Sequence, residues 1–197
     1  MEKSYKYISK WYDDNLNFYL KNGSILLNEQ LKKFLQYISK DGKVLDIGSG
    51  TGQDVDYFVK KGFNAYGLDF SAVMIKYSKS NRKGKFFNMN MTNLKFNDRN
   101  FDGAWASSSL FTHLYLKDIK RALTEVYRVL KKEAIFGVIA MKKERNERTR
   151  VPKNFIFNTF TKKELLDYLK KNKFIPFYTE IFIAHDKKWF FILSKKK

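Results

Sequence analysis

The sequence contains no cysteine, and its only prolines are Pro152 and Pro176. Disulfide bonds, cysteine-ligated zinc and thiol catalysis are therefore excluded for these residues. A chain without disulfides suits a reducing compartment, so a cytoplasmic location is expected. Because proline is so scarce, the sequence shows few chain-breaking positions that would mark the boundary of a second domain. No internal repeat or low-complexity linker is visible either.

Long apolar runs are also missing. No stretch approaches the roughly 20 consecutive apolar residues that a membrane-spanning helix needs. The first residues, Met1 to Lys6, lead into no continuous apolar segment, so a secretory signal is not expected. Hydrophobic residues make up 44% of the 197 positions, which is enough for one core and too little for two. We therefore expect a soluble protein with one structural domain and no membrane partner.

Negative charge is in short supply. The chain carries 39 lysines and arginines against 20 aspartates and glutamates, a formal net charge of +19. One interpretation is a polyanionic partner such as RNA. The other is a solvated lysine coat, which we favour because the cations are spread along the chain and are mostly lysine. Arginine is the better bidentate ligand for phosphate.

Apolar residues near the N-terminus recur at helical spacing. They are Ile25, Leu26, Leu31, Phe34, Leu35 and Ile38. Spacings of three and four residues put them on one helical face, which predicts helix over about 4–39. Asp41-Gly42 predicts a turn after it. We therefore expect residues 1–40 to form a helical lid, packed on a core formed by 41–197.

Beyond residue 42, predicted strands and helices alternate. The strands are expected at 43–47, 63–68, 85–88, 101–106, 134–141, 174–184 and 188–194. The helices are expected at 51–61, 71–80, 117–130 and 161–171. Alternation favours an α/β fold with a mostly parallel sheet covered on both faces. The last pair of strands is joined by a very short turn, so that pair must be antiparallel.

Three alternate glycines, Gly48, Gly50 and Gly52, separate the first strand from the next helix. Glycines let the backbone turn tightly and let a ligand approach the main chain. The following helix N-terminus offers unpaired N–H groups to an anionic group. The dinucleotide fingerprint G-x-G-x-x-G would need glycine where Gln53 stands, so NAD-type binding is a poor match. A glycine turn without any ligand is the plainer alternative.

Asp69 ends the second strand, about 20 residues after the glycines, where an acid can accept hydrogen bonds from ribose hydroxyls. The alternative is an ordinary acid at a helix N-terminus. Its place directly after Tyr66-Gly67-Leu68 favours nucleoside binding.

With these segments the chain resembles the class I S-adenosylmethionine-dependent methyltransferases. Residues 44–52, V-L-D-I-G-S-G-T-G, resemble the first motif of that family, and 66–71, Y-G-L-D-F-S, resemble the second. Residues 86–94 stand where the family usually has Asp-Met after the third strand, and 101–114 resemble the fourth strand with its ligand loop. Similarity at 11–13 and 188–191 extends the resemblance over nearly the whole chain.

The resemblance implies a fold, an activity and a cofactor. The fold would be a Rossmann-like, mostly parallel seven-stranded sheet with an antiparallel C-terminal hairpin and N-terminal helices. The activity would be methyl transfer from S-adenosyl-L-methionine. Gly48, Gly50 and Gly52 would pass under the methionine half of the cofactor, with Asp46 organising its ammonium group. Asp69, beside Phe70, would hold the ribose.

The remaining cofactor contacts follow from the same resemblance. Asn90 would face adenine, with Met91 against the ring. Ser107 and Leu110 would approach the methionyl part, and Tyr12 would close over the site. Asn90 departs from the usual aspartate, although its amide oxygen can still accept a hydrogen bond from an adenine amino group.

No obvious catalytic residue accompanies this site. A sulfonium is an activated leaving group, so proximity and orientation supply most of the catalysis, and a base is needed only if the acceptor must lose a proton. His113, after the fourth strand, is the candidate base or acceptor ligand, with packing as its alternative role. His185 is expected in a solvated turn, and the two histidines make no metal-ligand pattern.

Two segments leave alternatives open. Ser107-Ser108-Ser109 lack the G-x-S-x-G elbow of a nucleophilic serine, so we interpret them as small residues that let a ligand come close. The segment 142–159 carries Arg145, Arg148 and Arg150. These arginines would bind a carboxylate or phosphate of the substrate, or lie in a solvated loop.

Methyl transfer to a small molecule is the leading hypothesis. Transfer to RNA or another polyanionic partner is the second, since the net charge is so positive. A non-catalytic cofactor-binding protein is the third, and a nicotinamide oxidoreductase is a distant fourth. The sequence indicates no oligomeric state.

Overall fold

A computed structural model describes residues 3–22, 27–144 and 155–197. The N-terminal region contains α1 (Lys3–Asp14), α2 (Leu16–Asn22) and α3 (Asn28–Leu35). The helical stretch expected over 4–39 is thus divided, although the predicted apolar face is buried at Leu31, Phe34, Leu35 and Ile38. Ile25 and Leu26 lie outside the described residues.

The remaining elements follow the predicted alternation. They are β1 (Lys43–Ile47), α4 (Gln53–Lys60), β2 (Asn64–Asp69), α5 (Ala72–Asn81), β3 (Lys85–Asn88), β4 (Phe101–Ser107), α6 (Leu110–His113), α7 (Leu116–Val129), β5 (Leu130–Met141), α8 (Lys162–Lys171), β6 (Phe174–Ala184) and β7 (Lys187–Lys196). The starts of α5 and α8 are capped by side chains. The Ser71 hydroxyl accepts a hydrogen bond from the Met74 N–H, and Thr161 forms a capping box with Glu164.

Two local differences have physical causes. The short helix α6 was not predicted, because four residues are too few to show a helical period. The helix expected to end at Leu130 ends one residue earlier, and Leu130 is already extended and paired with Phe101. The Lys196 ammonium donates to the carbonyls of Tyr127 and Leu130, at 2.6 and 2.7 Å, so these groups near the end of α7 are satisfied.

The seven strands form one sheet in the order β3-β2-β1-β4-β5-β7-β6. β7 pairs antiparallel with both β5 and β6, and the other pairs are parallel. The predicted Rossmann-like fold is therefore confirmed. The chain builds the sheet outward from β1 on one side and from β4 on the other, so the switch point of the topology lies between these two strands. Ligands of such sheets bind at the switch point, beyond the carboxyl ends of the strands.

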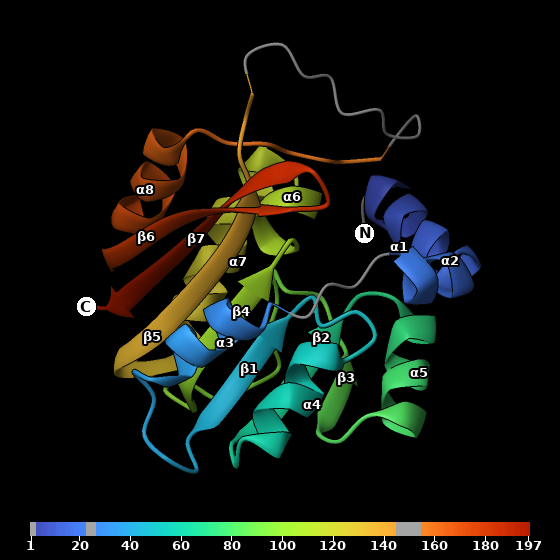
Figure 1. Cartoon of the computed structure of the whole chain (residues 1–197), viewed down its shortest axis with the longest axis horizontal. Helices are drawn as coiled ribbons and strands as arrows, with labels where there is room; N and C mark the ends of the chain where they lie inside the picture. Colours follow the sequence, from blue (N-terminus) through green and yellow to red (C-terminus); the bar gives the residue numbers. More distant parts are fainter. Residues whose placement is uncertain (1–2, 23–26, 145–154) are drawn as a thin grey trace.

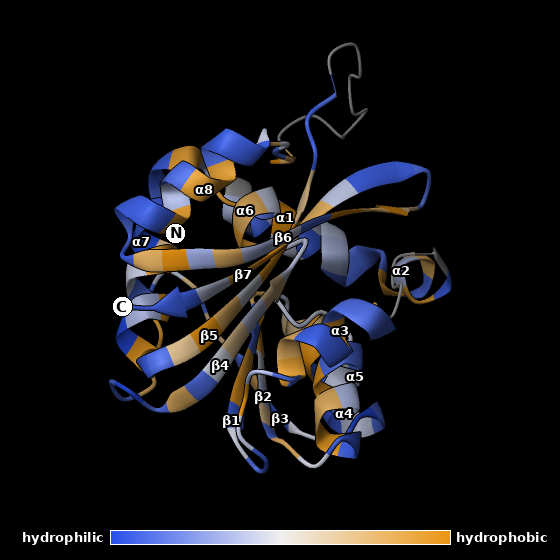
Figure 2. Ribbon diagram, turned by 60° about the vertical axis from the view of Figure 1, so that its left-hand side comes forward, coloured by the Kyte–Doolittle hydropathy of each residue, from blue (hydrophilic) through white to orange (hydrophobic). Residues whose placement is uncertain are grey.

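Helices cover both faces of the sheet (Figures 1 and 2). The buried cluster on one face includes residues of α3, α4 and α5, and the cluster on the other includes residues of α6, α7 and α8. Trp105 of β4 is fully buried against Phe34 of α3, with ring centroids 5.1 Å apart. Burying a side chain of this size contributes about 2–3 kcal/mol, so α3 is part of the core.

α1 and α2 lie next to each other above α5 (Figure 1). α1 is tied to the sheet domain by Asp13, which accepts a 2.5 Å hydrogen bond from Ser71, and by Tyr5, which donates to Asp118. The division into a lid of 1–40 and a core of 41–197 stays a prediction. Within residues 1–40, α3 packs on the sheet. Among the described helices, none has the length and apolar character that crossing a bilayer requires.

Candidate functional site

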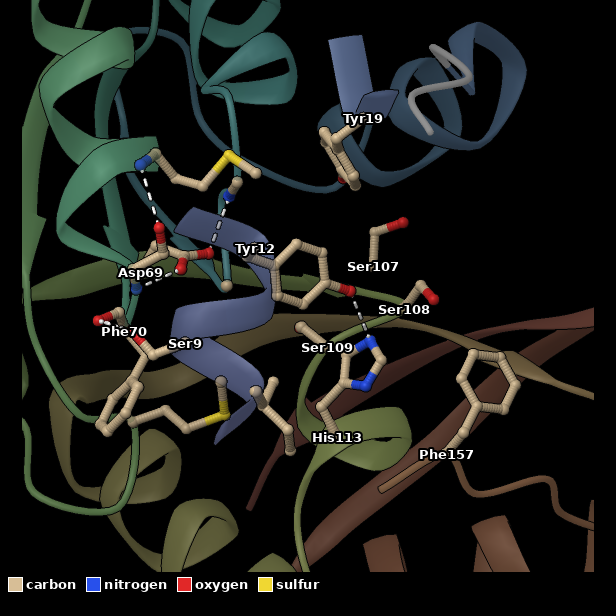
Figure 3. A pocket seen from close by; sticks show the side chains of 16 residues that line it. Ser9, Tyr12, Tyr19, Asp69, Phe70, Ser107, Ser108, Ser109, His113 and Phe157 are labelled. Atoms are coloured by element: carbon tan, nitrogen blue, oxygen red, sulfur yellow. Dashed lines mark hydrogen bonds between the residues drawn. The ribbon is translucent and has the colours of Figure 1, made fainter. Parts of the chain in front are cut away.

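A cavity of about 230 Å³ opens at the switch point of the sheet (Figure 3). Its floor comes from the loops after β1, β2 and β4, and α1 and α2 contribute its other side. Of the predicted site residues, it is lined by Tyr12, Gly48, Gly50, Asp69, Phe70, Met91, Ser107 and His113. The structure thus brings together residues that the sequence spreads over a hundred positions.

Other predicted site residues lie away from this lining. Leu110 is 0% exposed in the hydrophobic core, and Gly52 faces the Phe86 ring, which an added Cβ would approach to 2.6 Å. Asn90 lines a smaller apolar cavity of about 60 Å³, which shares Phe70 and Met91 with the main one. The Asn90 amide oxygen accepts hydrogen bonds from the Thr92 N–H and hydroxyl, both at 2.9 Å, so it stabilises its own loop.

The glycine loop is held by main-chain bonds and by one carboxylate. The N–H groups of Gly48 and Ser49 both donate to the Leu68 carbonyl at 2.8 Å. Asp69 accepts from the Gly50 N–H at 2.9 Å and from the Ser71 N–H at 2.8 Å. Gly48 has a φ of +77°, and an added Cβ would lie 2.4 Å from the Ser109 Cβ. Glycine is therefore required at position 48 on both steric and conformational grounds.

Acidic side chains gather at this end of the cavity. Desolvation raises the pKa of Asp46 well above its usual value, and the neighbouring Asp54 and Asp69 raise it further. Asp54 accepts a 2.8 Å hydrogen bond from the Trp105 indole N–H, yet desolvation still raises its pKa to about 6. Desolvation also raises the pKa of Asp69, partly offset by the N–H groups of Ser71 and Gly50. Such a cluster favours binding of a cation.

The Asp46 side chain does not line the main cavity but lies at the end of β1, directly before the glycine loop. It is only 2% exposed, and the like charges of Asp54 and Asp69 lie close enough to raise the pKa of its carboxyl further. The Ser49 hydroxyl is buried without a hydrogen-bond partner among the described residues. A buried, unpaired hydroxyl is costly, so it indicates that the loop is built to meet a polar ligand.

His113 bridges two segments across the opposite end. Its Nδ1 lies 3.0 Å from the Ile156 carbonyl oxygen and its Nε2 lies 3.0 Å from the Tyr12 hydroxyl. A carbonyl can only accept, so Nδ1 carries the proton and Nε2 accepts from Tyr12. Desolvation lowers the pKa of His113 to about 4. The imidazole is therefore neutral at pH 7 with both nitrogens engaged, which favours a positioning role over that of a base.

Aromatic rings surround the Tyr12–His113 pair. The Tyr12 ring lies 5.7 Å from that of Tyr19, and the His113 ring lies 5.7 Å from that of Phe157. Tyr19 and Phe157 both line the cavity but were not among the predicted site residues. Tyr19 stands seven positions after Tyr12, a spacing that places two residues on one helical face. That signal could have identified it.

Figure 3 shows how the two ends of the cavity differ: Asp69 and Phe70 lie on one side of Tyr12, and Ser107, Ser108, His113 and Phe157 lie on the other. His185 is exposed in the β6–β7 turn with a φ of 48°, as predicted. Arg145, Arg148 and Arg150 lie outside the described residues. Within the part of the chain that the structure describes, no three acidic or histidine side chains are grouped for metal binding.

Comparison with known proteins gives a family for this geometry. Residues 44–133 match the model of the methyltransferase domain family. A carboxy-S-adenosyl-L-methionine synthase of Nautilia profundicola is 28% identical over 147 residues, covering 69% of this chain and 61% of that protein. The chain spans 32–61% of the length of the curated relatives that it matches.

Solved structures give the same fold. A SAM-dependent methyltransferase of Methanosarcina mazei aligns with a TM-score of 0.75 and 24% identity, covering 82% of this chain and 95% of that one. The 1,6-didemethyltoxoflavin-N1-methyltransferase of Burkholderia thailandensis, solved with bound 1,6-didemethyltoxoflavin and S-adenosylhomocysteine, aligns with a TM-score of 0.81 and 16% identity. That alignment covers 100% of this chain and 92% of the other.

Proposed function

Because residues 44–133 belong to the methyltransferase domain of the class I S-adenosylmethionine-dependent family, we propose that this protein transfers a methyl group from S-adenosylmethionine to a small molecule. The observation that carries the proposal is the cavity at the switch point, with a glycine loop and carboxylates at one end and aromatic side chains at the other. The cofactor would supply a methyl group already activated on a sulfonium.

The residues present suit this cofactor. The buried Asp46 carboxyl group and the unpaired Ser49 hydroxyl would meet the polar methionine end, and Gly48 would let it approach the backbone. Asp69 would accept hydrogen bonds from ribose hydroxyls, as acids at the end of the second strand do in related folds. The apolar cavity beside Phe70 and Met91 would receive adenine, with Asn90 at its edge. Leu110, buried in the core, would support this wall from behind.

The chain's own contribution to the reaction is positioning. Tyr12 lies between the two ends of the cavity and is fixed by its hydrogen bond to His113. That arrangement would hold α1 over the bound molecules and exclude water. Placing an acceptor atom in line with the methyl group converts a bimolecular step into an effectively unimolecular one, which lowers the barrier by about 7–11 kcal/mol in well-oriented systems.

A small molecule is favoured over RNA by the lining of the cavity. No lysine or arginine among the described residues lines it, although the chain carries 39 of them. A polynucleotide would be expected to meet cations beside the reacting base. The net charge of +19 is the observation that favours RNA. Salt-dependent retention of the protein on RNA, together with methylation of that RNA, would support the alternative.

Calorimetry with S-adenosylmethionine, S-adenosylhomocysteine and NAD in parallel tests the proposal. We expect both adenosyl ligands to bind, and each to raise the melting temperature according to its concentration over Kd. Binding of NAD alone would contradict the proposal. Transfer of a labelled methyl group into a small-molecule fraction of the cell extract would support catalysis. Tight cofactor binding with no labelled acceptor would instead favour a non-catalytic protein.

A further inference from the structure

A second cavity, of about 100 Å³, adjoins the first and shares Ser107 and Ser108 with it. We call it the Trp189 cavity. Its other lining residues are Leu27, Ile139, Phe182, Ala184, His185 and Trp189. They come from the segment before α3, from β5 and from the β6–β7 hairpin. The two cavities are therefore separated only by the point where the chain leaves β4.

The backbone at this boundary is strained. Ser108 has a φ of +47°, a left-handed conformation that residues other than glycine rarely adopt. It is held there by the hydrogen bond from its N–H to the Ile139 carbonyl, at 3.0 Å. Strain of this kind persists where the surroundings enforce it, and it often occurs at ligand sites. Here it places two small serines between the cavities, so a ligand in one can approach a ligand in the other.

The lining of the Trp189 cavity is largely apolar. None of the described residues that line it is Asp, Glu, Lys or Arg, and His185 lies in the exposed β6–β7 turn. A charged ligand would lose hydration over most of this surface without gaining a partner. Phe182 and Trp189 face each other as cross-strand partners, and the Trp189 indole N–H is already used by the Ala184 carbonyl at 3.0 Å. These rings offer apolar area to a flat aromatic molecule.

The hydrogen bonds of the His113 imidazole bear on which methyl acceptors can react. His113 has no free nitrogen, because Nδ1–H donates to Ile156 and Nε2 accepts from Tyr12. The serine hydroxyls at the boundary are not basic at neutral pH. His185, which lines the Trp189 cavity, lies instead in the exposed β6–β7 turn. An acceptor whose attacking atom already presents a free lone pair at neutral pH needs neither imidazole as a base.

We propose that the Trp189 cavity binds the methyl acceptor, and that the acceptor is a flat, uncharged aromatic molecule with a basic ring nitrogen. This inference rests on the proposed function. The nitrogen lone pair forms the new N–CH₃ bond while the S–CH₃ bond breaks and its electron pair passes to sulfur. The N-methylated product carries the positive charge that the sulfonium loses, so no proton has to leave.

Quinoline is a suitable probe, with Ala184→Phe as the test variant and Ile183→Phe as its matched control. Ala184 lines the Trp189 cavity, so a phenyl group there would fill it. Ile183 is its neighbour on β6, points to the opposite face and is 71% exposed. S-adenosylhomocysteine affinity, measured first, shows that each variant is folded. Ala184→Leu is a smaller replacement to be used if the phenylalanine variant does not bind that ligand.

We expect the wild-type protein loaded with S-adenosylhomocysteine to bind quinoline, and labelled S-adenosylmethionine to yield N-methylquinolinium by mass spectrometry. Ala184→Phe should weaken quinoline binding at least about tenfold by filling the cavity, while S-adenosylhomocysteine affinity and the Ile183→Phe control stay within about twofold. If S-adenosylhomocysteine binds but quinoline does not, or binds Ala184→Phe equally well, the inference is wrong. If S-adenosylhomocysteine itself fails to bind the wild-type protein, the proposed function fails.

Discussion

The two ends of the site are built in opposite ways. The carboxylate end, which contains Asp46, Asp54, Asp69 and the glycine loop, comes from two short stretches of sequence and relies on main-chain groups and negative charge. The aromatic end, which contains Ser107, Ser108, His113 and Phe157, relies on side chains from distant segments and lacks charge in its described lining. In the proposed function, the carboxylate end would recognise the cationic cofactor, while the aromatic end, which shares Ser107 and Ser108 with the Trp189 cavity, would face the neutral acceptor.

Removing the Asp69 carboxylate should cause the largest loss of cofactor affinity. Asp69→Ala removes the acceptor for the Gly50 and Ser71 N–H groups and the proposed ribose contact. Each hydrogen bond to a charged group contributes about 1.5–3 kcal/mol, so S-adenosylhomocysteine should bind about a hundredfold more weakly by calorimetry. Asp69→Asn, which keeps one oxygen acceptor, should lose less. Unchanged affinity in Asp69→Ala would place the ribose elsewhere.

Acidification should weaken cofactor binding through the carboxylate end. The pKa of Asp54 is raised to about 6, so below that pH the carboxyl gains a proton and loses its attraction for a cationic ligand. S-adenosylmethionine affinity should therefore fall by up to about tenfold between pH 7.5 and pH 5. Asp54→Asn should make this pH profile shallower, with the raised pKa values of Asp46 and Asp69 accounting for the rest. Asp167→Asn, at a residue on α8 that does not line the cavity, should leave the profile unchanged. A wild-type profile that is already flat would contradict the charge argument.

The same carboxyl links pH to folding stability. Its pKa is about 6 in the folded protein, whereas the ordinary pKa of an aspartate is 3.8, so the folded state keeps a proton that the unfolded state releases. The free energy of unfolding should therefore fall as the pH rises from 3.8 to about 6. Asp54→Asn should remove this contribution, which thermal melts across that pH range would measure.

The smallest loss of cofactor affinity is expected from a change at Tyr12, which lies between the two ends. Tyr12→Phe removes the hydroxyl that donates to His113 but keeps the ring against Tyr19. A single neutral hydrogen bond contributes about 0.5–1.5 kcal/mol, so S-adenosylhomocysteine affinity should fall by roughly two- to tenfold. Tyr7→Phe, at an exposed position of the same helix, is the control. A loss as large as that of Asp69→Ala would mean that the cofactor depends on both ends equally.

At the carboxylate end, the sequence predicted Gly48, Gly50 and Asp69, which line the cavity, but it did not predict Asp54. Gly48, Gly50 and Asp69 act through main-chain geometry next to predictable strand ends, so their order in the sequence is enough to place them. The alternation of strands and helices likewise predicted the mixed sheet. Leu110 shows the limit of this reasoning: it follows the ligand-binding loop closely, but the start of α6 turns its side chain into the core.

The aromatic end depends on packing between distant segments, which no local pattern encodes. Phe157 lines the cavity beside His113, which is distant from it in the sequence, with the two ring centroids 5.7 Å apart. Trp189 lies beside Ser108 only because β7 pairs with β5. The hydrogen-bond partners of His113, Tyr12 and the Ile156 carbonyl, are likewise distant from it in the sequence.

The position of Tyr12 has a kinetic consequence. α1 lines one side of the cavity, and Tyr12 joins it to α6 by a hydrogen bond. In the proposed function, release of the spent cofactor would therefore require this helix to move. We therefore expect turnover to be limited by product departure, so that pre-steady-state measurements show a burst of one equivalent of methylated product before the slower steady rate.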